Sequence, residues 1–83
     1  MVKKMMEVHG MPVFFGDRIR SARKAAGLTQ RQLAGNLQIL GLDVDKNAVQ
    51  RIESGQRFVT DIELIYLSKA LKKSIDQLLG INP

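Results

Sequence analysis

The sequence contains no cysteine and a single histidine, His9. Without cysteine the chain cannot form disulfide bridges, thiolate metal sites or a cysteine nucleophile, and it is compatible with a reducing compartment. The carboxylates are scattered, and the close pair Asp43 and Asp45 fits a turn and a helix cap better than a cation site, which needs more oxygen ligands. The glycines are isolated and form no phosphate-binding loop. These absences argue against an enzyme and predict neither a metal nor a cofactor.

Long hydrophobic runs are also missing from the sequence. No run approaches the roughly 18 apolar residues of a membrane span. Near the start, Lys3 and Lys4 precede a segment that charge interrupts before it reaches the apolar run of about seven residues that a signal peptide needs. We therefore expect a cytoplasmic protein with no membrane partner. Residues 1–12 are predicted to be a flexible arm, with a basic arm that touches phosphate as the alternative, and residues 13–83 to form the domain.

The composition fits one small folded domain with a basic surface. The chain has 83 residues, of which 45% are hydrophobic, enough for a single modest core. Thirteen Lys and Arg residues against eight Asp and Glu give a formal net charge of +5. This excess favours a polyanionic partner, nucleic acid above all, although it also fits plain solubility.

The apolar residues recur at helical spacing. The first helix, from about Phe15 to Ala26, has an apolar stripe on one face and ends at Gly27. Its opposite face carries Arg18, Arg20 and Lys24, which form either a solvated face or part of a basic surface next to DNA.

Capping residues predict where the later helices begin. Three hydroxyl residues are each followed, three positions on, by Glu or Gln, the pattern of a reciprocal capping box: Thr29 with Gln32, Thr60 with Glu63, and Ser74 with Gln77. Asp45 is a suitable N-cap for a helix from about Lys46 to Ser54. The sequence shows no period-2 strand pattern, so it predicts an all-α bundle of five short helices.

The helix from Lys46 to Ser54 has the side-chain chemistry of a base-reading helix. Val49 and Ile52 are expected to face the core, which leaves four polar side chains outward: Lys46, Asn47, Gln50 and Arg51. Asn and Gln match the major-groove edge of adenine, while Arg and Lys match the two acceptors of guanine. A merely solvated face is the alternative. The capped helix before it favours DNA reading, because its first amides and Gln30 would point at a phosphate.

Three motifs together resemble the phage-repressor type of helix-turn-helix domain, the xenobiotic-response-element family. The motifs are Gly27-Leu28-Thr29-Gln30, then Gln32-Leu33-Ala34, then Val49-Gln50-Arg51-Ile52-Glu53-Ser54-Gly55. The resemblance covers about Phe15 to Leu79. It implies a compact five-helix bundle in which the second and third helices form the helix-turn-helix.

The resemblance also implies roles for individual residues. The third helix enters the major groove of double-stranded DNA, so the implied base readers are Lys46, Asn47, Gln50 and Arg51. The implied phosphate contacts are Gln30, Arg31, Gln56 and Arg57, the last two from the loop after that helix. In the family, the glutamate of the Ile-Glu-x-Gly motif often pairs with an arginine of the first helix, which implies a partly buried ion pair between Arg23 and Glu53.

The expected function is sequence-specific transcriptional regulation, as a repressor acting as a homodimer on a palindromic operator. The dimer surface is expected on the last helices, with these candidates: Ile65, Tyr66, Ile75, Leu78, Leu79 and Ile81. Core burial within the monomer is the alternative for Leu78 and Leu79. The alternative function is an antitoxin or another module that binds a protein partner through the C-terminal helices.

Two features depart from the family pattern. The span from Gln30 to Val49 is longer than usual by about five residues, somewhat more than one helical turn. A longer second helix is the favoured explanation, because the stretch stays apolar and glycine is absent until Gly41. Lys72 and Lys73 stand where the family usually has glycine and an apolar residue, so a different cap is expected there.

Overall fold

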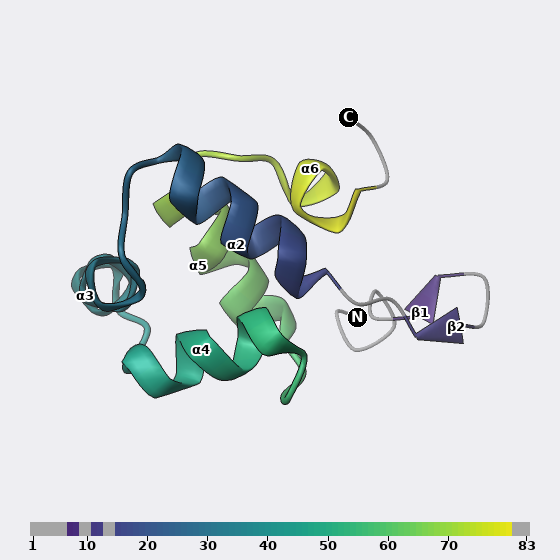
Figure 1. Ribbon diagram of the computed structural model, residues 1–83, viewed down its shortest axis with the longest axis horizontal. Helices are drawn as coiled ribbons and strands as arrows, with labels where there is room; N and C mark the ends of the chain where they lie inside the picture. The colour runs from purple at the N-terminus through teal and green to yellow at the C-terminus, as the bar shows by residue number, and fades with distance from the viewer. Residues whose placement is uncertain (1–6, 9–10, 13–14, 81–83) are drawn as a thin grey trace.

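The fold of the described residues is a bundle of five short helices, shown in Figure 1. The computed structural model describes residues 7–8, 11–12 and 15–80. The helices are α2 (Gly16–Ala25), α3 (Gln30–Leu40), α4 (Lys46–Ser54), α5 (Asp61–Leu71) and α6 (Ile75–Leu79). Helices α2 and α4 lie within one residue of their predicted ranges, and α3, α5 and α6 begin directly after the predicted caps Thr29, Thr60 and Ser74. The all-α fold class is confirmed.

A short pair of strands precedes the bundle. β1 (Glu7–Val8) and β2 (Met11–Pro12) pair antiparallel, with Glu7 opposite Pro12 and Val8 opposite Met11. The sequence predicted a flexible arm over residues 1–12, because strands of two residues are too short to show an alternating pattern. His9 lies outside the described residues.

The helix starts follow from the predicted caps. The hydroxyl of Thr29 accepts a hydrogen bond from the amide of Gln32 at 3.0 Å, and the side chain of Gln32 accepts one from the amide of Thr29 at 2.9 Å. Thr60 and Ser74 form the same reciprocal boxes. Asp45 accepts from the amide of Ala48 at 2.8 Å and caps α4. These local bonds fix the positions at which α3, α4, α5 and α6 begin.

The core lies between the five helices, and α6 contributes Leu78 and Leu79 to it. In Figure 1, α2 crosses α5, and α4 runs along one end of the bundle. Helix α4 packs against both α2 and α3, and α6 packs against α2 and α5. The buried apolar residues are Phe15, Ile19, Ala22, Leu33, Ala34, Leu37, Val44, Val49, Ile52, Val59, Leu64, Leu67, Leu71, Leu78 and Leu79. Burial of this single core supplies most of the driving force for folding.

Helix α3 accommodates the long span before α4 by continuing to Leu40, the arrangement that the sequence favoured. Gly41 ends the helix with φ of 110°, a left-handed conformation that glycine adopts without steric cost. The side-chain amide of Gln38 then donates to the carbonyl of Val44 at 2.7 Å, and Val44 is buried. The connector is therefore tied back to α3 rather than left as a free loop.

Lys72 ends α5 in a left-handed conformation, with φ of 56° and ψ of 42°. Among the described residues it is the one non-glycine residue with positive φ. Because a Cβ atom is strained in this region, we expect Lys72→Gly to raise the free energy of unfolding by about 0.5–1 kcal/mol, measured by urea denaturation. Lys73→Gly is the matched control and should destabilise slightly or change nothing. Equal effects at both positions would contradict the strain argument.

Candidate nucleic-acid interface

Helix α4 separates a buried face from an exposed one. Val49, Ile52 and Glu53 are buried against the bundle. The opposite side chains are exposed, and they are the four that the sequence predicted to project outward: Lys46, Asn47, Gln50 and Arg51. Ser54 is exposed as well, and its hydroxyl donates to the carbonyl of Arg51 at 3.3 Å. The helix thus presents amide and cationic groups together on its solvent side.

The starts of α3 and α4 lie side by side. Arg31, Lys46 and Asn47 line one open hollow of about 460 Å³ between the two helices. Arg31 and Lys46 also line an adjoining hollow of about 570 Å³, together with Thr29 and Gln30. Both cationic side chains are exposed. The fold therefore places an expected phosphate contact next to two expected base readers.

The ion pair implied by the resemblance is present between α2 and α4. The Nε of Arg23 donates to Oε2 of Glu53 at 2.6 Å, and its Nη2 donates to Oε1 at 3.1 Å. The Nη1 of Arg23 donates to the carbonyl of Leu28 at 2.8 Å. Glu53 is 0% exposed and Arg23 is 8% exposed. The bidentate contact with Glu53 fixes α2 relative to α4, and the bond to Leu28 fixes the turn after α2.

Two further side chains donate to Glu53. Gln30 donates from Nε2 to Oε1 at 3.1 Å, and Arg20 donates from Nε to the same oxygen at 3.4 Å. Gln30 was expected to contact phosphate, but one of its two amide hydrogens is occupied by this internal bond. The spacing of the sequence did not reveal the role of Arg20, whose partner lies 33 residues away. Glu53 thus connects α2, α3 and α4.

The environment of Glu53 keeps its carboxylate charged. Burial by itself would raise the pKa of Glu53. Hydrogen bonds from Arg23, Gln30 and Arg20, together with the positive charge of Arg23, outweigh burial and hold the pKa below its usual 4.5. The pair is therefore ionised at neutral pH.

Arg57 is engaged within the chain. Its Nη1 donates to Oε1 of Glu63 at 3.0 Å, and its Nη2 donates to Oε2 at 2.8 Å. Nη1 also donates to the carbonyl of Phe58 at 2.8 Å. These contacts brace the loop between α4 and α5, so the charge of Arg57 is already compensated. Gln56, the other expected phosphate contact of this loop, is exposed.

Two of the expected dimer-surface residues are part of the monomer core. Leu78 is 1% exposed and Leu79 is 4% exposed, because α6 packs against α2 and α5. The expectation that they face a partner is corrected in favour of core burial. Ile75 is half-buried and packs against the same core. Ile81 lies outside the described residues.

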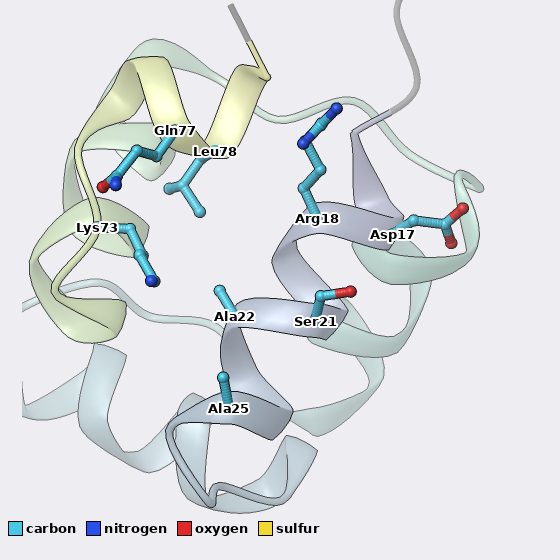
Figure 2. A pocket seen from close by; sticks show the side chains of 8 residues that line it. All are labelled: Asp17, Arg18, Ser21, Ala22, Ala25, Lys73, Gln77 and Leu78. Carbon is cyan, nitrogen blue, oxygen red and sulfur yellow. The ribbon is translucent and has the colours of Figure 1, made fainter. Parts of the chain in front are cut away.

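A separate hollow of about 540 Å³ opens between α2 and α6 (Figure 2). Figure 2 shows Lys73, Gln77 and Leu78 on one side of it and residues of α2 on the other. Its lining carries both signs of charge, with Asp17 beside Arg18 and with Lys73. The lining contains no residue of α4, so this hollow is not part of the candidate interface.

Residues 7–8, 11–12 and 15–80 contain no group of three or more His, Cys, Asp or Glu side chains that could hold a metal ion. Over the same ranges, none of the helices has the length and apolar character needed to cross a membrane.

The sequence was compared with family models, curated proteins and solved structures. A family model described as a helix-turn-helix domain matches residues 15–79. No significant match was found among curated proteins.

Among the solved structures that are similar to this chain are three regulatory proteins. The restriction-modification controller protein C.AhdI from Aeromonas hydrophila is 35% identical with a TM-score of 0.70, over 80% of this chain and 88% of that chain. The P22 c2 repressor protein, solved in complex with synthetic operator 9T, is 30% identical with a TM-score of 0.71, over 83% of this chain and 97% of that chain. The clp gene regulator ClgR from C. glutamicum is 27% identical with a TM-score of 0.70, over 81% of this chain and 80% of that chain.

Proposed function

Because this chain belongs to the helix-turn-helix domain family, we propose that it is a sequence-specific DNA-binding regulator of transcription that uses α4 to read the major groove. The observation that carries the proposal is the exposed face of α4, where Asn47, Gln50 and Arg51 lie outward while the other face is locked into the core. The similarity to a repressor solved with its operator supports the same function.

The proposed mechanism divides the contacts by their chemistry. Arg31, beside Lys46 where the starts of α3 and α4 adjoin, attracts phosphate and positions the domain on the duplex. Gln30 can still donate its second amide hydrogen, and Gln56 is exposed at the other end of α4. The base readers then donate to base edges and supply sequence preference; they are Lys46, Asn47, Gln50 and Arg51. This is a binding function, and we propose no catalytic one.

Repression by occupancy is the regulatory mode that we propose. A domain of this size covers an operator and blocks other proteins from it. A homodimer would place two α4 helices about 34 Å apart on a palindromic site, which doubles the number of contacts. Such a regulator works where the DNA is, so we expect it in the cytoplasm of a bacterial cell.

The test begins with fluorescence anisotropy of a labelled random-sequence duplex at low and moderate salt. We expect affinity to fall by about tenfold or more over this range, because phosphate contacts release counterions. An operator is then selected from a random pool of duplexes, and the selected sites should share a palindromic sequence. No binding at low salt would contradict the proposal.

The alternative is a protein-interaction module such as an antitoxin. Its candidate surface on α6 is reduced, because Leu78 and Leu79 are buried in the core. DNA binding therefore has the stronger support from the described residues.

A further inference from the structure

The three cationic residues on the outer face of α2 have different surroundings. Arg18 lines the hollow between α2 and α6 (Figure 2), and a Cβ atom on Gly80 would collide with its guanidinium. Lys24 lies in the last turn of α2, where the helix dipole favours a cation. Arg20 points to the junction of α2, α3 and α4, because its Nε donates to Oε1 of Glu53 at 3.4 Å. Arg20 is therefore the member of this set that the structure places at the helix-turn-helix.

Arg20 lies next to the residue at the start of α3 that is expected to contact phosphate. Gln30 donates from Nε2 to Oε1 of Glu53 at 3.1 Å, and the same oxygen accepts from Arg20. Two donors that share one acceptor atom lie side by side. Gln30 also lines the hollow of about 570 Å³ that reaches Arg31 and Lys46. The guanidinium of Arg20 therefore adjoins the surface on which the proposed duplex rests.

The positive charge of Arg20 exceeds what Glu53 can compensate. Glu53 carries one negative charge, and Arg23 already donates to both of its oxygens, at 2.6 and 3.1 Å. Arg20 donates to one of these oxygens only, at the longer distance of 3.4 Å. The side chain of Arg20 is 42% exposed, whereas that of Arg23 is 10% exposed. A second guanidinium beside one carboxylate leaves a net positive charge at the surface, and phosphate is the group of DNA that neutralises such a charge.

Arg20 also has hydrogen-bond donors left for a ligand. A guanidinium carries five N–H groups, and in the described part of the chain only the Nε of Arg20 forms a hydrogen bond. Because the guanidinium is planar, the bond from Nε to Glu53 fixes its plane and leaves Nη1 and Nη2 to donate elsewhere. Gln30 keeps its second amide hydrogen as well. The two side chains can therefore donate together to the oxygens of one phosphate.

We propose that Arg20 and Gln30 form a shared clamp on one phosphate of the DNA backbone, with Glu53 holding both side chains in position. The inference rests on the proposed function and deepens it, because it adds α2 to the helices that contact the duplex. It also gives Glu53 a second role beyond the stability of the bundle, since one buried oxygen orients both donors.

The first test compares Arg20→Ala with Arg18→Ala, the same change two positions away on α2. Fluorescence anisotropy measures binding to a labelled random-sequence duplex over a series of salt concentrations. Arg20→Ala should lose about tenfold in affinity and lower the slope of log affinity against log salt by about 0.9, the amount for one phosphate. Arg18→Ala should keep both values near those of wild type. An unchanged slope in Arg20→Ala, or equal effects of the two changes, would overturn the proposal.

Two further variants separate a phosphate contact from a purely structural role of Arg20. Arg20→Lys keeps the charge and should retain most of the salt slope. Arg20→Gln keeps a donor for Glu53 without the charge and should lose the slope as Arg20→Ala does. The opposite order would show that Arg20 acts only as a brace and would overturn the proposal. The melting temperature, measured by circular dichroism, should change little in both variants, because Arg23 still pairs with Glu53.

Mapping on the selected operator tests whether Arg20 and Gln30 share one phosphate. Duplexes are made in which a single phosphate at a time is replaced by an uncharged methylphosphonate. The position that weakens binding by wild type but not by Arg20→Ala marks the phosphate that Arg20 contacts. Gln30→Ala should become insensitive at the same position. Two different positions for the two variants would overturn the shared clamp.

Failure of this inference is distinguishable from failure of the proposed function. A wild type that binds no duplex at low salt would overturn both. If wild type binds and Arg20→Ala matches it in affinity and in salt slope, then the clamp is wrong and the DNA-binding function stands.

Discussion

Glu53→Ala is expected to lower the free energy of unfolding by roughly 3–5 kcal/mol, the usual loss when one partner of a buried ion pair is removed. The carboxylate of Glu53 is 0% exposed and accepts hydrogen bonds from three side chains. Its removal leaves the guanidinium of Arg23 buried beside a cavity. A small domain is stable by only about 5–15 kcal/mol, so the melting temperature should fall on the order of 15–30 °C, measured by circular dichroism.

Glu63→Ala is the control for this prediction. Glu63 also pairs with an arginine, but that pair is partly exposed, with side-chain exposures of 28% for Arg57 and 14% for Glu63. We therefore expect a smaller loss, about 1–2 kcal/mol including the capping box. If Glu53→Ala cost no more than Glu63→Ala, the central role of the Arg23–Glu53 pair would be refuted.

The dependence of the melting temperature on acid pH is a second test of the Arg23–Glu53 ion pair. The folded protein holds the pKa of Glu53 below 4.5, so the stabilising contribution is present above that value and is lost as the pH falls through the lower folded pKa. The melting temperature of wild type should therefore drop steeply below pH 4.5. Glu53→Ala should show a shallower dependence, with the remainder coming from Glu63, whose pKa is also lowered.

The double variant Gln50→Ala/Arg51→Ala is expected to lose roughly a hundredfold or more in affinity for the selected operator, since each good base contact contributes about 1–3 kcal/mol. Both side chains are exposed on α4 and take part in no core packing, so the melting temperature should change little. Anisotropy with operator and random duplexes measures the result. The ratio of the affinity for the operator to the affinity for the random duplex should fall toward one.

Lys73→Ala is the control for the loss of one positive charge. Lys73 lies in the link between α5 and α6 and lines the hollow of Figure 2, away from α4. It should weaken binding to both duplexes slightly and leave their ratio unchanged. An unchanged ratio in the Gln50/Arg51 double variant would show that α4 does not read bases.

Much of this fold could be predicted from sequence because its signals are local. A capping box spans four residues, so Thr29 with Gln32 and Thr60 with Glu63 could be recognised without any tertiary information. The outward direction of Gln50 and Arg51 followed in the same way, from helical spacing around Val49. Local hydrogen bonds and periodicity therefore predicted the helices and the face that α4 presents.

The rest depended on contacts between distant residues. The bond from Gln30 to Glu53 joins residues 23 positions apart, and that from Arg20 joins residues 33 apart. Neither hydrogen bond can be recognised from the local sequence pattern. Burial of Leu78 was ambiguous for the same reason, because an apolar residue on a short helix fits a core and a partner surface equally well. The pair of Arg23 and Glu53 was anticipated only through the family resemblance.

The two faces of α4 have different consequences for how such a protein can change over generations. Its inner face is constrained by the core, and a change of Glu53 alone is expected to destabilise the folded state. The outer side chains, Asn47, Gln50 and Arg51, contribute little to that state. Substitutions there can alter the DNA target while the scaffold keeps its stability. One fold can thereby acquire new targets through a handful of surface changes, and duplicated copies can diverge without first becoming unstable.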